Sequence, residues 1–304
     1  MIPFYSYLRD IRPPGFHGAG LYDVFRFFFK GIFNAQFNLM AAAIAYNFFF
    51  SLFPTLILLF TLLPYVPVEN LQEQILFYTK AFVPADTSNL VDRIVKASFQ
   101  KMGIGVIILN IVLILQPSLR GIIAMMNAFR KPNEMEVRRT VFHLYGRAIM
   151  IFVILNLFLI LAILFLNIGG YLIGYAKAHN IIGYGLDALL LTALNYTMTL
   201  LLLLFSVTMI YFIGGTNKER WRFFSPGSII SAVLLLLTLI ALNYYFSNFG
   251  NYNKIYGGLA TVIILMLWFY YIAIVILLGN ELNYAIDQAE KYKRNFKANA
   301  RRLS

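Results

Sequence analysis

The chain contains no cysteine. This absence excludes disulfide bonds, thiolate nucleophiles and cysteine-ligated metal sites. Charged residues are also scarce, because only 12% of the 304 residues are Asp, Glu, Lys or Arg. A soluble domain carries about 25% charged residues, so the composition argues against an ordinary soluble domain.

Acidic side chains and histidines are few and scattered along the chain. There are 13 Asp and Glu residues and three histidines. Metal-dependent cleavage of phosphodiesters needs clustered carboxylates that hold one or two cations. No Asp-x-Asp pair, P-loop, Gly-x-Ser-x-Gly or His-Glu-x-x-His motif occurs. We therefore expect no catalytic residue, no bound metal, no cofactor and no enzymatic activity.

Long apolar runs recur along the sequence, in which 60% of the residues are hydrophobic. Each run is long enough to cross a hydrocarbon core of about 30 Å as a helix. The sequence therefore predicts an all-α polytopic membrane protein, with residues 1–304 forming a single membrane domain. No cleavable signal peptide is visible, so we expect the first span to act as its own insertion signal. The predicted spans lie near 39–63, 103–129, 147–172, 187–214, 226–246 and 256–280.

Lysine and arginine set the expected orientation of the spans. Most of the 25 basic residues fall in the two tails and in the loops after the second and fourth spans. By the positive-inside rule, both termini are then cytoplasmic. The tail at 281–304 is strongly basic and is expected to face the anionic inner leaflet. The net charge of +12 follows from this bias and does not indicate a nucleic-acid partner.

Two segments outside the spans have amphipathic patterns. On a helical wheel of 21–33, Asp23, Arg26 and Lys30 fall within about 60° of one another. This pattern is typical of a helix in the interface of an anionic leaflet, or of one that packs on the protein's own cytoplasmic end. The segment 64–102 is expected to form two short amphipathic helices on the outer membrane surface. The apolar side of 21–33 consists of Leu21, Val24, Phe25, Phe28 and Ile32.

Three stretches resemble the BrkB/YihY family of bacterial inner-membrane proteins. AAAIAYNFFFSLFPTLILLF at 41–60 is similar to the family's opening helix, and TKAFVPADTSNLV at 79–91 to its periplasmic segment. YFSNFGNYNKIYGGLATVIILMLWFYYIAIVILLGNEL at 245–282 resembles its closing motif. The resemblance implies an inner-membrane protein with six spans. It implies little about activity, because the family's biochemical function is not settled and its older label, ribonuclease BN, is regarded as a misassignment.

Arg120 lies inside the second predicted span, after Pro117 and before Gly121. A buried arginine at this depth costs at least ~2.5 kcal/mol unless it is paired or hydrated. Pro117 is expected to kink the helix, since it lacks an amide proton. Arg120 then either faces an internal polar cavity, which we favour, or extends along the helix to the headgroups.

Glu281 ends the sixth apolar run, and Gly279 beside it allows close approach of another helix. Glu281 is either an ordinary interfacial acid paired with Arg147 or Arg222, or the buried partner of Arg120. The resemblance favours a specific role for the Gly279–Glu281 pair.

Three further local features concern helix packing and helix ends. Ala41 and Ala45, four residues apart, indicate a close-packed seam on the first span, and Pro54 is expected to kink that span. Ser225 is expected to cap the fifth helix, with Pro226 at its first position.

The stretch SNFGNYNKIYGG at 247–258 lies on the outer side between the last two spans. Asparagine and glycine tolerate positive φ, so a tight turn accounts for much of it. Its aromatic rings and single lysine also suit an anionic headgroup at the membrane interface. The candidate substrate contacts here are Asn248, Asn251, Tyr252, Lys254 and Tyr256.

Two functions fit these features. One is a transporter or flippase-like protein for an amphipathic substrate such as an anionic lipid or a lipid-linked molecule. The other is a structural membrane protein whose basic tails recruit partners. A polar interior reached from one leaflet favours the first function, and a solid apolar interior favours the second.

Overall fold

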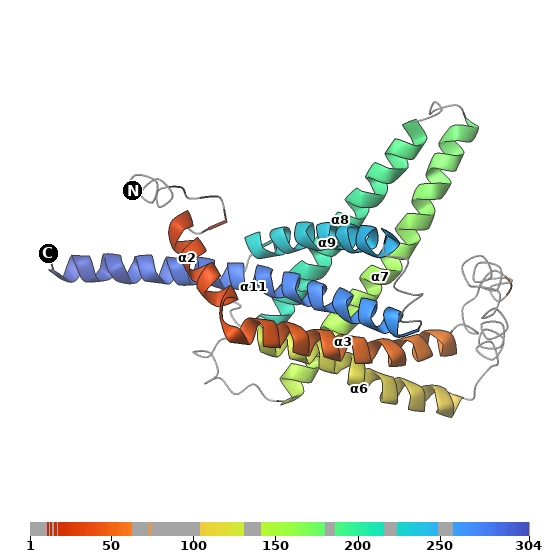
Figure 1. Ribbon diagram of the computed structural model, residues 1–304, viewed down its shortest axis with the longest axis horizontal. Coiled ribbons are helices and arrows are strands. Elements are labelled where there is room, and N and C mark those ends of the chain that lie inside the picture. Colours follow the sequence, from red (N-terminus) through yellow and green to blue (C-terminus); the bar gives the residue numbers. More distant parts are fainter. Residues whose placement is uncertain are drawn as a thin grey trace. The chain divides into compact units, whose positions relative to one another are not determined.

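A computed structural model describes most of the chain. The described residues are 18–62, 104–130, 141–179, 186–215, 224–248 and 258–303, together with Ile11, Pro13, Gly15, Phe16 and Glu73. The secondary structure within these residues is helical. The helices are α2 (Leu21–Ile32), α3 (Ala35–Leu62), α6 (Ile104–Ala128), α7 (Val141–Ala178), α8 (Leu186–Gly214), α9 (Pro226–Asn248) and α11 (Gly258–Leu303) (Figure 1).

A helix lies at each of the six places where the sequence predicts a span. Within the described residues, four stretches are long and apolar enough to cross a membrane, and α2 with α3 adds a fifth if the two form one bent span. The protein is therefore a helical, multi-pass membrane protein, while the number six stays a prediction. The four stretches are Val141–Phe158, Tyr196–Gly214, Pro226–Tyr245 and Val262–Asn295.

The chain divides into two compact units. One unit comprises Met1–Tyr46 and Ile122–Ser304, and the other comprises Asn47–Gly121. In the first unit α7 packs against α8, α8 against α9, α9 against α11, and α11 against α2. Figure 1 shows α7 and α8 as a long antiparallel pair. The rings of Phe158 and Phe205 lie 6.3 Å apart between these two helices.

The last helix, α11, is much longer than a membrane span. Its 46 residues correspond to roughly 70 Å of helix, whereas a hydrocarbon core is about 30 Å thick. The basic segment at 281–304, predicted as the cytoplasmic tail, is part of the same helix, which continues without a break to Leu303. The spanning part and its extension form a single rod.

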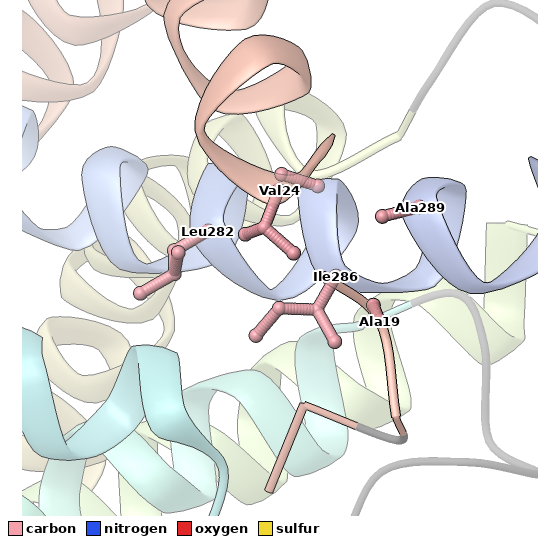
Figure 2. Close-up of a cluster of buried hydrophobic side chains, with 6 residues drawn as sticks. Ala19, Val24, Leu282, Ile286 and Ala289 are labelled. Atoms are coloured by element: carbon pink, nitrogen blue, oxygen red, sulfur yellow. The ribbon is translucent and has the colours of Figure 1, made fainter. Parts of the chain in front are cut away.

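The side of α2 that carries Val24 packs on α11 between Leu282 and Ala289. Val24 is buried together with Ala19, and the two contact a seam of α11 formed by Leu282, Ala285, Ile286 and Ala289 (Figure 2). Of the two possibilities for the 21–33 helix, packing on the protein's own helices is therefore realised on this side. Lys293 reinforces the contact, since its Nζ donates a hydrogen bond of 2.6 Å to the Gly18 carbonyl.

The predicted packing residues of the first two spans lie in different units. Ala41 and Ala45 belong to the first unit and are buried. In the second unit a Cβ on Gly121 of α6 would approach the Phe48 ring of α3 to 3.0 Å, so Gly121 lies at a close contact. Pro54 and Pro117 both lie inside helices that continue on either side of them, and the kinks stay predictions.

Candidate functional site

A close helix crossing in the first unit lies between α9 and α11 at Gly227 and Gly279. A Cβ on Gly279 would overlap the side-chain oxygens of Ser231 and Tyr211, and would lie 2.6 Å from the Gly227 carbonyl oxygen. A Cβ on Gly227 would likewise overlap the Gly279 carbonyl oxygen and lie 2.6 Å from Asn283. Only glycine therefore fits at either position.

The missing side chain at Gly279 exposes the carbonyl groups of the preceding turn of α11 to neighbouring helices. The Tyr211 hydroxyl of α8 donates to the Ile276 carbonyl at 2.6 Å. The Ser231 hydroxyl of α9 donates to the Val275 carbonyl at 3.1 Å, and the two hydroxyl oxygens are 2.9 Å apart. Since each hydroxyl carries one proton, two protons serve these three contacts. The network joins α8, α9 and α11 at one point.

The N-terminus of α9 is held by the same helix, α11. Ser225 accepts from the Ser228 amide at 3.1 Å, and the Ser228 hydroxyl accepts from the Ser225 amide at 3.1 Å. The amide of Gly227 donates to Asn283 Oδ1 at 2.9 Å, and Asn283 Nδ2 donates to Ser225 Oγ at 2.9 Å. Pro226 has no amide proton, so every free amide of this first turn has a partner. The predicted Ser225 cap is confirmed.

Glu281 lies on the other side of α11, against α2. It is 4% exposed, and a Cβ on Gly31 of α2 would overlap its carboxylate. Two residues after Gly279 means a rotation of about 200°, which places Glu281 away from the α9 crossing. A buried carboxylate in a stretch apolar enough to span the membrane is costly, and such residues are usually functional.

The role of Arg120 at an internal polar cavity stays a prediction. Its side chain is exposed, whereas Ser118, Leu119 and Gly121 are buried. A helix buries only a stripe of its surface against neighbours, and Arg120 lies outside that stripe. This exposure fits both a hydrated cavity and an arginine that extends along the helix to the headgroups.

Most of the substrate contacts predicted at 247–258 lie outside the described residues. Asn248 is the last residue of α9, and Asn251, Tyr252, Lys254 and Tyr256 lie outside the described residues, as does the segment 64–102 except for the exposed Glu73. Arg147, one partner considered for Glu281, has a buried Nη1 without a hydrogen bond. Among the residues searched, no three His, Asp or Glu side chains are grouped so as to hold a metal ion.

The sequence reasoning missed Tyr211, Ser231 and Asn283. The small residues Gly227 and Ser231, four apart on α9, are the pattern that marks a close helix interface in a membrane and was the available signal. Tyr211 and Asn283 carried no comparable signal, because a single polar residue in an apolar run does not indicate which helix it will meet.

Comparisons with known proteins identify the family. The profile of the family described as Virulence factor BrkB matches residues 28–304. The ribonuclease-like protein YfkH of Bacillus subtilis is 28% identical over 251 residues, which cover 83% of this chain and 90% of that protein. A UPF0761 membrane protein of Tolumonas auensis is 31% identical over 136 residues, 43% of this chain and 44% of the relative. No solved structure matches. The chain, a multi-pass helical membrane protein matched along most of its length, thus belongs to the Virulence factor BrkB family.

Proposed function

We propose that this protein is a transporter or flippase-like protein of the bacterial inner membrane that moves an amphipathic lipid or lipid-linked substrate. The observation that carries the proposal is the buried carboxylate of Glu281, which lies within the last apolar stretch, Val262–Asn295, and against Gly31. A carboxylate kept in such a place, at a cost in solvation, suits a group that binds a cation or exchanges a proton during transport.

A second polar group supports a polar interior. Thr208 of α8 is 1% exposed, and its hydroxyl oxygen makes no hydrogen bond in the described structure. A threonine in a helix usually bonds the carbonyl of the preceding turn, and a buried hydroxyl without a partner costs about 1–3 kcal/mol. Arg120, whose side chain is exposed, and the outer segment 247–258 remain the proposed contacts for an anionic headgroup.

The proposal is tested with purified protein in liposomes that contain a labelled anionic or zwitterionic lipid. Wild type is expected to accelerate movement of the label between leaflets, and Glu281→Gln to reduce the rate by roughly tenfold because the amide neither titrates nor pairs with a cation. Lys291→Gln, at an exposed position on α11, is the matched control and should behave as wild type. Wild-type protein that is folded and moves no lipid under any ion gradient would contradict the transport proposal.

The second candidate is a scaffold. The continuous 46-residue α11 favours it, because a rigid basic rod beyond the membrane presents a surface for partners. We also propose, on the sequence grounds given above, that the chain is not a nuclease, so the name of the Bacillus relative is not transferred to it.

The orientation of the chain is tested independently. We expect both termini in the cytoplasm, because the basic residues concentrate in the tails and in two loops. At residue 300, a fused reporter that works only in the cytoplasm should be active, and one that works only outside should be inactive. At residue 180 the opposite result is expected. The reverse pattern would place Glu281 at the outer face and overturn the roles assigned to both membrane surfaces.

A further inference from the structure

Three phenylalanines form an exposed row along α2. The ring centroids of Phe25 and Phe29 are 6.1 Å apart, and those of Phe29 and Phe33 are 6.2 Å apart, with planes inclined by 22° and 20°. The three side chains are 43%, 49% and 82% exposed. A spacing of four residues keeps the rings on one side of the helix. We call this row the aromatic ladder.

The opposite side of α2 is already occupied. Val24 is buried in the cluster with Leu282 and Ile286 (Figure 2). Phe27 and Phe28 pack against that cluster. On a helical wheel Phe29 and Phe33 lie roughly 140° and 180° from Val24, and Phe25 lies roughly 100° from it. The ladder therefore cannot reach α11 unless α2 leaves its present contact.

Basic side chains border the ladder. Arg26 and Lys30 are both exposed, and they lie between the ladder and the docked side on the wheel. An apolar row with cations along its border suits a helix in the plane of an anionic leaflet, where rings enter the acyl region and cations meet phosphate. Because α2 also directly precedes α3, the first apolar span, it is tethered near such a surface.

We propose that the aromatic ladder inserts into an anionic lipid leaflet while the other side of α2 holds α11, so that α2 is a lipid-dependent clamp on the cytoplasmic extension of α11. The occupant of the ladder is the leaflet and not a second copy of this chain. Each phenylalanine buries about 150–250 Å² when covered, so three rings supply a substantial driving force. The clamp goes beyond the proposed transport and does not require it.

The absence of cysteine makes the lipid contact directly measurable. Single nitroxide labels are placed at Phe29→Cys, Val24→Cys and Lys291→Cys in nanodiscs that contain phosphatidylglycerol. The Phe29 label should collide several-fold more often with oxygen than with a water-soluble nickel complex, and the Lys291 label should show the reverse preference. The Val24 label should be protected from both reagents. Nickel access at Phe29 equal to that at Lys291 would overturn the proposal, as would protection from both reagents together with a dimer in solution.

The clamp itself is tested by a disulfide between Val24→Cys and Ile286→Cys, two positions in the same buried cluster. Serine at all three ladder positions should slow the formation of this disulfide several-fold, and Arg26→Gln with Lys30→Gln should abolish its dependence on phosphatidylglycerol. Phe142→Ser is the matched control, because this aromatic residue on α7 is 86% exposed and lies outside the ladder. An unchanged disulfide rate in the serine variant would refute the clamp, and this result does not depend on whether the protein moves lipid.

Discussion

Replacing Gly279 with alanine is expected to lower the stability of the protein by about 3 kcal/mol and to leave little folded material. The added Cβ would overlap Ser231 and Tyr211 and press on the Gly227 carbonyl. Overpacking of this kind costs about 1–3 kcal/mol, and each hydroxyl–carbonyl hydrogen bond that is lost costs about 1 kcal/mol more. The gain in helix propensity, about 1 kcal/mol, offsets only part of this loss.

Unfolding of the purified protein in detergent, followed by helix content and by size-exclusion chromatography, measures the effect. Gly146→Ala is the matched control, because a Cβ at this exposed position on α7 meets nothing within 4 Å. This variant should be as stable as wild type or slightly more stable. Removing the obstructing oxygen should help, so Gly279→Ala with Ser231→Ala is expected to be more stable than Gly279→Ala alone. Equal stability of Gly279→Ala and Gly146→Ala would show that the crossing is looser than described.

The second large effect is expected for Asn283→Leu, which removes both bonds between α11 and the start of α9. The buried Gly227 amide would lose its acceptor, and Ser225 Oγ would lose a donor. An unpaired buried amide costs about 1–3 kcal/mol, and the leucine must also fit beside the Gly227 backbone. We expect a loss of about 2–4 kcal/mol, together with faster hydrogen exchange in the first turn of α9.

Asn283→Asp tests the two hydrogen bonds of Asn283 separately, because it keeps the acceptor and removes the donor. The aspartate keeps an acceptor for the Gly227 amide, and its charge is favourable at a helix N-terminus. It should therefore be clearly more stable than Asn283→Leu. Asn243→Leu replaces an exposed asparagine of α9 and should be close to wild type. If Asn283→Leu and Asn243→Leu unfold at the same point, Asn283 does not support the start of α9.

The contacts of α11 with α8 and α9 differ in kind from its contact with α2. Around Gly279 and Asn283, α11 is joined to α8 and α9 by hydrogen bonds that pair the polar groups at this contact. Such a contact is suited to holding the three helices in one fixed arrangement. Glu281, Leu282 and Ile286 of α11 contact α2, whose outer surface carries the exposed aromatic ladder. Movement of α2 would uncover a buried carboxylate without disturbing the arrangement of α8, α9 and α11. The transport proposal and the clamp thus concern the contact of α11 with α2, and the stability predictions concern its contacts with α8 and α9.

The sequence by itself determined the helical class, the positions of the apolar helices and the start of α9 at Ser225–Pro226. These features depend on local properties, since run length sets a spanning helix and a serine before a proline caps its own turn. The family is also a property of the sequence alone. The continuation of α11 as one helix to Leu303 was not determined in this way.

Tertiary structure alone decided which residues meet. Gly279 was visible as a small residue, but its partners Tyr211 and Ser231 come from helices far away in the chain. The wheel of α2 showed one apolar side, whereas packing on α11 divides its apolar residues into a docked side at Val24 and an exposed ladder at Phe25, Phe29 and Phe33. The physical reason is that the spacing of apolar residues shows which sides of a helix can be buried. Which of these sides is buried depends on the surfaces of the neighbouring helices.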